Sequence, residues 1–194
     1  MVKPLEKNNL KNFELFDKMI SGIAINGETI DHELNSVIYT SHDYSLSKKE
    51  NILKFTYNLQ KFLSEKNILS LTFFMTKNEN WLKYSHHDPV YKELADAYKF
   101  LKAGLNKNYF KGVFTSSFKD LKSFVPHLYS IRYYDPIVPH IYFASDNSDL
   151  LFHICSYCNL HIYFYGDSIS CPDYFKTINL KEEKYFGGKY LNEN

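Results

Sequence analysis

The 194-residue chain is 44% hydrophobic and 23% charged, with a formal net charge of +1, as is typical of a globular domain with one core. Its lysines are scattered and Arg132 is its only arginine, so the basic stripe typical of nucleic-acid binding is missing. No apolar run is long enough to cross a bilayer. Three cysteines, without a signal-like N-terminal segment, predict reduced thiols and a cytoplasmic location. Neither a nucleic-acid nor a membrane partner is expected.

The N-terminal segment predicts one amphipathic helix. Apolar residues recur at helical spacing from about Asn9 to Ile23, and Gly22 and the pair Asn26-Gly27 end the pattern. We therefore expect an N-terminal helical extension over residues 1–34 and one α/β domain over residues 35–194.

A strand–helix–strand rhythm begins after the extension. Ser36–Ser41 is a β-branched and aromatic run that predicts a strand. The segment after it has apolar residues at helical spacing, with Ser45 or Ser47 as the N-cap. Ile68–Thr76 is continuously apolar, as expected of a strand that is buried on both faces.

The middle of the chain continues this alternation. A helix is predicted with Asp88 as N-cap, Pro89 at its first position and Gly104 after its last turn. Tyr109–Phe118 predicts a strand. The stretch "KDLKSFVPHL" then predicts a short helix that is broken by Pro126.

The last third predicts strands over Val138–Ser145 and Leu160–Gly166. Between them, "DNSDLLFHICSYCN" predicts a helix capped by Asn147 or Ser148, and the tail predicts a short helix before its Gly-Gly pair. Alternating strands and helices of this kind indicate an α/β fold with a doubly wound, mostly parallel five-stranded sheet.

The motif "HICSYCNLH", from His153 to His161, has the spacing of a candidate metal or redox site. On the predicted helix, Cys155 and Cys158 fall on the apolar face, while His153 points the other way. A structural zinc site needs four converging ligands, so the pattern favours buried thiols. Metal binding and redox or nucleophilic use are the alternatives, and no metal ligand is assigned.

Polar loops follow the predicted strands, where ligands bind in a parallel sheet. They contain Asp43, Asp120, Asp146 and Asp167, which suit a nucleotide ribose or a metal but equally suit helix caps. The chain has neither a phosphate-binding glycine loop nor a G-x-S-x-G elbow. A Rossmann dehydrogenase, a P-loop NTPase and an α/β-hydrolase are therefore not expected.

Ser36–Trp81 resembles the opening of a TIR or SEFIR-type domain. The resemblance lies in a first strand that ends in a Ser-His-Asp loop, a helix with an "L..FL" end and a second strand. It implies a flavodoxin-like sheet, self-association through domain contacts and, in many members, cleavage of NAD or a product made from it. On this basis no resident cofactor is required, and NAD or a related nucleotide is the expected substrate. The residues assigned to nucleotide binding are Ser41, His42, Asp43, Trp81, Asp146 and Asp167.

Catalytic members of that family use a glutamate on the helix after the third strand. Here the corresponding helix carries Asp120 as its only acid, and Glu93 on the preceding helix is the second candidate. An aspartate is one methylene shorter, so the resemblance leaves open whether the chain is an enzyme.

Three functions follow as hypotheses. The first is a TIR-like cytosolic protein of defence signalling, which processes a nucleotide or acts by assembly as a homo-oligomer. The second is a non-enzymatic protein-interaction factor, such as a phage or bacterial inhibitor or immunity protein, suggested by the 17 tyrosines. The third is a small-molecule sensor, or an enzyme of another class on the same fold.

Overall fold

The computed structural model of the chain describes the following residues: 3–5, 13–23, 34–40, 45–75, 80–82, 91–106, 109–135, 138, 140–145, 147–154, 159–165, 181–186 and 189–190. Four helices and nine strands lie within this part of the chain. The helices are α1 (Phe13–Ser21), α2 (Lys48–Glu65), α3 (Lys92–Leu105) and α4 (Phe118–Tyr134). The strands are β1 (Lys3–Leu5), β2 (Leu34–Thr40), β3 (Ser70–Met75), β4 (Val113–Ser117), β5 (Ile141–Ala144), β6 (Leu151–Ile154), β7 (Leu160–Tyr165), β8 (Lys181–Phe186) and β9 (Lys189–Tyr190).

All nine strands form one sheet in the order β1-β4-β3-β5-β6-β7-β2-β8-β9. The α/β class is confirmed, but the parallel, flavodoxin-like arrangement is wrong, because each described strand pair is antiparallel. For the two pairs that β6 makes, the cause lies in the connections. The links on either side of β6, residues 145–150 and 155–159, are too short for the crossover of a dozen or more residues that a parallel pair requires.

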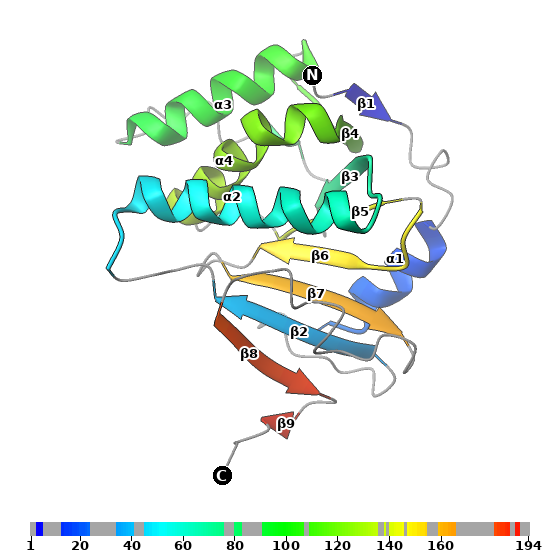
Figure 1. The fold of residues 1–194 in the computed structure, drawn as a ribbon. Helices are drawn as coiled ribbons and strands as arrows, with labels where there is room; N and C mark the ends of the chain where they lie inside the picture. Colours follow the sequence, from blue (N-terminus) through cyan, green and yellow to red (C-terminus); the bar gives the residue numbers. More distant parts are fainter. Residues whose placement is uncertain are drawn as a thin grey trace.

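The sheet is covered by helices on both faces, as Figure 1 shows: α2, α3 and α4 lie on one face and α1 lies on the other. β1 pairs with β4, and α1 places Phe16 and Met19 against the sheet. The N-terminal segment thus contributes a strand and a covering helix, while the division of the chain at residue 34 stays a prediction. None of the described helices has the length and apolarity needed to span a membrane.

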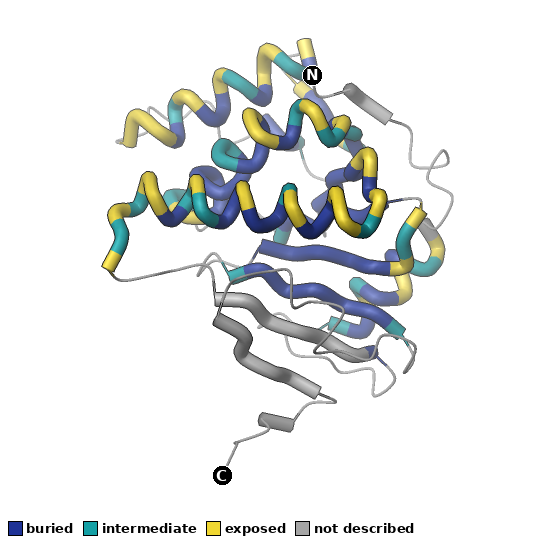
Figure 2. The backbone as a smooth tube through the Cα atoms, viewed as in Figure 1, coloured by how far each residue is buried: buried dark blue, intermediate teal, exposed yellow. Residues whose placement is uncertain are grey.

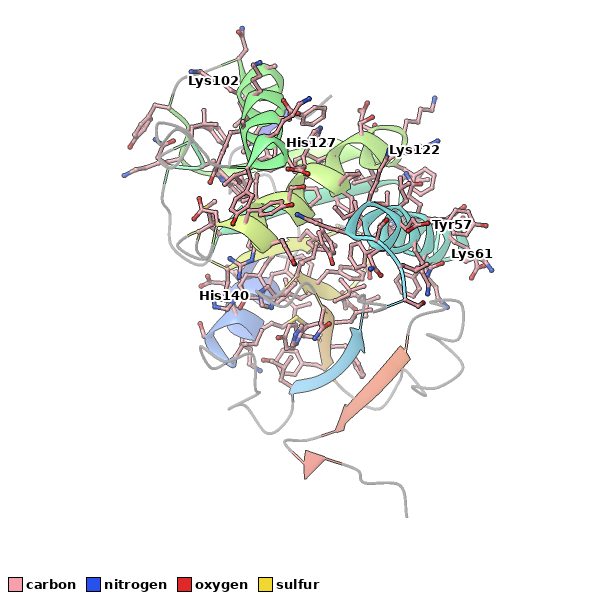
Figure 3. All side chains as sticks on the ribbon, turned by 90° about the vertical axis from the view of Figure 1, so that its left-hand side faces the viewer. Tyr57, Lys61, Lys102, Lys122, His127 and His140 are labelled. Carbon is pink, nitrogen blue, oxygen red and sulfur yellow. The ribbon has the colours of Figure 1, made fainter. Side chains whose placement is uncertain are left out.

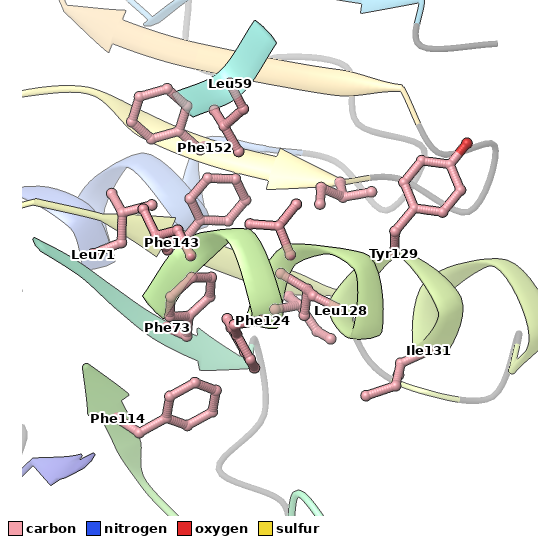
Figure 4. Close-up of a cluster of buried hydrophobic side chains, with 14 of the residues drawn as sticks. Leu59, Leu71, Phe73, Phe114, Phe124, Leu128, Tyr129, Ile131, Phe143 and Phe152 are labelled. Carbon is pink, nitrogen blue, oxygen red and sulfur yellow. The ribbon is translucent and has the colours of Figure 1, made fainter. Parts of the chain in front are cut away.

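The main core lies between the sheet and the three-helix layer. Phe73 is its centre, with ring centroids at 5.3 Å from Phe114, 5.3 Å from Phe143 and 4.7 Å from Phe124 (Figure 4). Figure 2 shows the buried central strands and the helices exposed only on their outer sides. Aromatic pairs at such separations add to area burial, so β3 is held by side chains from both neighbouring strands and from α4.

Several predicted elements are confirmed. The predicted strands at Ser36–Ser41 and Ile68–Thr76 correspond to β2 and β3. Ser47 is the N-cap of α2 and forms a capping box with Glu50, whose pKa is lowered by the side-chain and backbone hydrogen bonds of Ser47.

Two helix boundaries differ from the prediction. α3 begins at Lys92 with Tyr91 as its N-cap, so Asp88 and Pro89 precede the helix, and Gly104 lies inside it. α4 continues through Pro126 to Tyr134. Proline removes one helical hydrogen bond, but the eight buried residues of α4 maintain the helix on both sides of it.

Two predicted helices are strands. Residues 151–154, expected within a helix, form β6, because Leu151 and His153 face one side of the sheet and Phe152 and Ile154 the other, with all four buried. A short apolar run fits either period, and here the partner strands decide. The tail forms β8 and β9 where a short helix was predicted.

The antiparallel order divides the strand termini between two ends of the sheet. At the first, hereafter the β6 end, β2, β3 and β6 finish and β5 and β7 begin. At the opposite end, the β7 end, β4, β5 and β7 finish. Loops that a parallel sheet would gather at one edge are therefore divided between two.

Arg132 ties the last turn of α4 to the β6 end. Only 3% of its surface is exposed, and its guanidinium donates from Nε to the carbonyl of Ile154 at 3.2 Å and from NH1 to that of Val138 at 2.6 Å. A planar guanidinium can bridge two acceptors in this way, whereas an ammonium on a flexible stem is a point donor.

We predict that Arg132→Lys lowers the free energy of unfolding by roughly 2–4 kcal/mol, because a buried carbonyl loses its donor. Urea unfolding followed by circular dichroism measures the loss. The matched control is Lys61→Met at an exposed position of α2, with an expected change below about 0.5 kcal/mol. Equal effects of the two substitutions would contradict a bridging role for Arg132.

Candidate functional site at the β6 end

The two predicted catalytic acids lie far apart. Asp120 is in the first turn of α4, which follows β4 at the β7 end, and its Oδ2 accepts a hydrogen bond from Ser117 Oγ at 2.8 Å. Glu93 is exposed in the first turn of α3 and raises the pKa of Tyr134. Tyr134 follows Asp120 by fourteen positions on α4, which is about 21 Å along the axis. The two acids cannot share one site.

Of the residues assigned to nucleotide binding, Trp81 is a core residue. It is 2% exposed, its ring centroid lies 4.6 Å from that of Phe114, and its Nε1 donates to the carbonyl of Gly112 at 2.9 Å. It therefore presents no free face to a ligand. The other five, Ser41, His42, Asp43, Asp146 and Asp167, lie outside the described residues, and their assignment stays a prediction.

Three tyrosines form an aromatic cluster where the ends of three helices meet, hereafter the tyrosine platform: Tyr91 stacks on Tyr134, and Tyr133 meets Tyr134 edge to face. Tyr91 precedes α3, and Tyr133 and Tyr134 end α4. The Tyr91 and Tyr134 centroids are 4.5 Å apart, and those of Tyr133 and Tyr134 are 5.0 Å apart. Lys48 Nζ, at the start of α2, lies 2.8 Å from the Tyr134 centroid and 4.2 Å from that of Tyr133. The platform is thus held in place by stacking and cation–π contacts.

The platform packs on the end of α4 and leaves two of its rings exposed to solvent. Tyr98 of α3 donates its hydroxyl to Asp135 Oδ2 at 2.8 Å, which joins α3 to the end of α4. Burial, with Glu93, Tyr133 and Tyr91 nearby, raises the pKa of Tyr134, so its hydroxyl stays protonated at neutral pH. Tyr91 is 50% exposed and Tyr133 is 45% exposed. Two rigid aromatic side chains are therefore available to a partner.

On the face of the sheet away from α2, α3 and α4, rings from four strands form a buried row at the β6 end, hereafter the histidine row. The residues Phe74, Tyr142, His153 and His161 stand opposite one another in register, with successive centroid distances of 6.2, 4.7 and 5.4 Å. His140, on the approach to β5, places its Nδ1 2.9 Å from His153 Nε2. Figure 3 shows the molecule with the β6 end turned toward the viewer and His140 labelled.

The histidines of this row are neutral. Burial lowers the pKa of His153 well below its usual 6.5, and His161, His140 and Arg132 lower it further. Burial and then His140 lower the pKa of His161 to about 4, and its Nδ1 lies 3.4 Å from the Tyr163 hydroxyl. The row is a set of unprotonated imidazoles in a low-dielectric setting.

Sequence reasoning missed this row, although its signal was present. The motif from His153 to His161 was assigned to a helix and a strand, which separated the two histidines. In a hairpin the same eight-residue spacing places them directly opposite each other. Within the described part of the chain, no three His, Cys, Asp or Glu side chains are arranged to hold a metal ion.

Comparison with known proteins gives no match: no family model, curated protein or solved structure is significantly similar to this chain. The functional argument therefore depends on the described residues themselves.

We predict that acid destabilises the protein through the histidine row. Unfolded histidine binds a proton near pH 6.5, whereas folded His161 does so only near 4, so stability is full above 6.5 and falls as the pH drops between these values. At about 1.4 kcal/mol per pKa unit, His161 alone accounts for roughly 3 kcal/mol. Urea unfolding measured between pH 4 and pH 7 gives this loss, and it should be smaller in His161→Phe. An identical pH dependence of the two proteins would contradict the assignment.

Proposed function

We propose that the chain acts by binding a protein partner through the tyrosine platform, as a non-enzymatic inhibitor or immunity factor would. The observation that carries this proposal is the pre-organisation of Tyr91 and Tyr133, which are half exposed yet fixed by Tyr134 and Lys48. Tyrosine is enriched in the hot spots of interfaces, and a side chain that is already ordered loses less conformational entropy on binding.

The charge of the helical layer indicates the chemistry of the partner. Within α2, α3 and α4 there are nine lysines and five acidic residues, although the chain as a whole has a net charge of only +1. A partner surface with acidic residues around an apolar centre would complement both the lysines and the exposed rings. Association should therefore weaken as the ionic strength rises.

Site-specific photo-crosslinking tests this proposal. A benzoylphenylalanine at position 133 should capture one discrete protein in the source cell, and the same group at Tyr57, a 67% exposed tyrosine of α2, should not. With the captured protein purified, Tyr91→Ala with Tyr133→Ala should weaken binding at least tenfold, because truncated hot-spot residues cost more than about 1.4 kcal/mol. Tyr57→Ala should leave binding unchanged.

Equal capture at positions 57 and 133, or unaltered affinity of the double variant, would refute the platform as the binding surface. Capture of a second copy of the chain would show self-association in place of a separate partner.

A second candidate, nucleotide processing of the TIR kind in defence signalling, is favoured by one placement. Glu93 lies beside the tyrosine platform at the β6 end, where β2 finishes directly before Ser41, His42 and Asp43 in the sequence. A carboxylate beside aromatic rings can stabilise an oxocarbenium-like ribosyl cation. The parallel sheet that the resemblance implies is not the support for this candidate, because the sheet is antiparallel.

Incubation with NAD, followed by chromatographic measurement of nicotinamide, tests the second candidate. If it holds, Glu93→Gln abolishes nicotinamide release, whereas Asp120→Asn leaves it intact, because Asp120 lies about 21 Å along α4 from Tyr134 of the platform. No release from the wild-type protein, even after forced oligomerisation, would exclude this activity.

A further inference from the structure

The hydrogen bond between His140 and His153 depends on a single proton. Nδ1 of His140 lies 2.9 Å from Nε2 of His153. Both atoms are imidazole nitrogens, so one of them must carry a hydrogen while the other accepts with its lone pair. One added proton can enter at a ring nitrogen that faces away from the pair and leave this bond intact. When a second proton enters, both facing nitrogens carry hydrogen and the bond is lost.

The two rings differ in how readily they take up a proton. His140 is half-buried, and burial, followed by the charge of Arg132, lowers its pKa. His153 is fully buried, and its Nδ1 has no hydrogen-bond partner among the described residues. A charge or a donor without a partner is costly in such a setting. The first proton therefore enters at His140, and the second must enter the buried ring and break the pair.

The described groups around His153 do not offset an added charge. His161, His140 and Arg132 each lower its pKa further, and the ring centroid of His161 is 5.4 Å away. Tyr142, its partner on β5, stays uncharged, because burial raises the pKa of its hydroxyl to about 12. The other described residues of the packed elements are either uncharged, namely Phe74 of β3, Ile38 of β2, Tyr163 of β7 and Phe16 and Met19 of α1, or exposed, namely Glu14, Asp17 and Lys18 of α1.

The histidine pair and Arg132 join the same two segments. Val138 lies two residues before His140 and Ile154 directly follows His153, and Arg132 donates to the carbonyl groups of both. Separation of the two rings moves these carbonyls apart, and a planar guanidinium of fixed geometry cannot follow both. Tyr133 is the next residue of α4, so a break in the pair reaches the tyrosine platform through one side chain.

We propose that the His140–His153 pair is an acid-operated latch on the tyrosine platform, closed while one proton lies between the two facing nitrogens and open when both rings are charged. The open state binds more protons, so a falling pH favours it. Solvated histidine binds a proton near pH 6.5 and folded His161 near 4, and opening is expected between these values. The consequence for a partner, which rests on the proposed function, is binding near neutral pH and release in acid.

Fluorine NMR of 3-fluorotyrosine at position 133 tests the latch in the full-length protein without any partner. Between pH 7.5 and pH 4 the resonance should move from its value in the ordered platform toward that of the unfolded protein. The curve should be steeper than that of one independent group, because more than one proton is taken up. The emission of Trp81, the only tryptophan and a residue of the main core, should stay constant through this transition. The same label at the exposed Tyr57 should not move.

Three variants assign the transition to the pair. His153→Phe removes the site of the second proton, so the resonance at position 133 should keep its neutral-pH value. His140→Gln should give the same result, because an amide oxygen accepts from His153 whether or not that ring is charged; it decides the test if Trp81 emission shows that His153→Phe does not fold. His127→Gln, the matched control, removes another half-buried histidine, which stacks on Phe100, and should retain the wild-type transition.

A resonance that does not move would overturn the latch. So would a movement that coincides with a change in Trp81 emission, because it would report global unfolding, or one that His140→Gln leaves unchanged.

The effect on binding is measured with the protein captured by photo-crosslinking at pH 7.5. Its dissociation constant should rise roughly tenfold once about nine chains in ten are open, and His140→Gln should reduce this rise. An equal affinity at pH 7.5 and pH 5 would overturn the control of binding. Failure to capture a partner would refute the proposed function alone, because the fluorine signal tests the latch without one.

Discussion

The buried guanidinium of Arg132 is the interaction on which the β6 end depends. It joins α4 to two carbonyl groups. One belongs to Val138, which precedes β5, and the other belongs to Ile154, the last residue of β6. Tyr133 and Tyr134 follow it directly on the helix, and its charge lowers the pKa of His140 and His153. In a chain whose other strong bases are all lysines, the single arginine stands where one side chain must donate to two acceptors in a dry setting.

The sequence predicted most elements but not their arrangement, and the difference has a physical cause. α2 was predictable because its capping box and apolar period agree, and β3 because its run is continuously apolar. β6 was not, because "LLFHI" fits a helix or a strand equally well. That one assignment determined the directions of β5, β6 and β7: a helix between β5 and β7 permits parallel strands, whereas a strand there leaves connections that are too short for a parallel crossover.

The same change determines which candidate residues can act together. In a parallel sheet Asp43 and Asp120 would both follow strands at one edge, but β2 and β4 run in opposite directions here. Glu93, which ranked second on the family pattern, is the acid beside the tyrosine platform. Neither the platform nor the histidine row could be found by periodicity, because each joins residues from three or more segments that only the tertiary structure brings together.

The histidine row and the tyrosine platform are mechanically connected through Arg132. Ile154 directly follows His153 on β6, and its carbonyl is held by Arg132, one residue before Tyr133. The last residue of β6 is therefore held by the same helical turn that presents the platform. Loss of the Arg132 contact should then loosen Tyr133 as well, so that the platform loses more conformational entropy when it binds a partner.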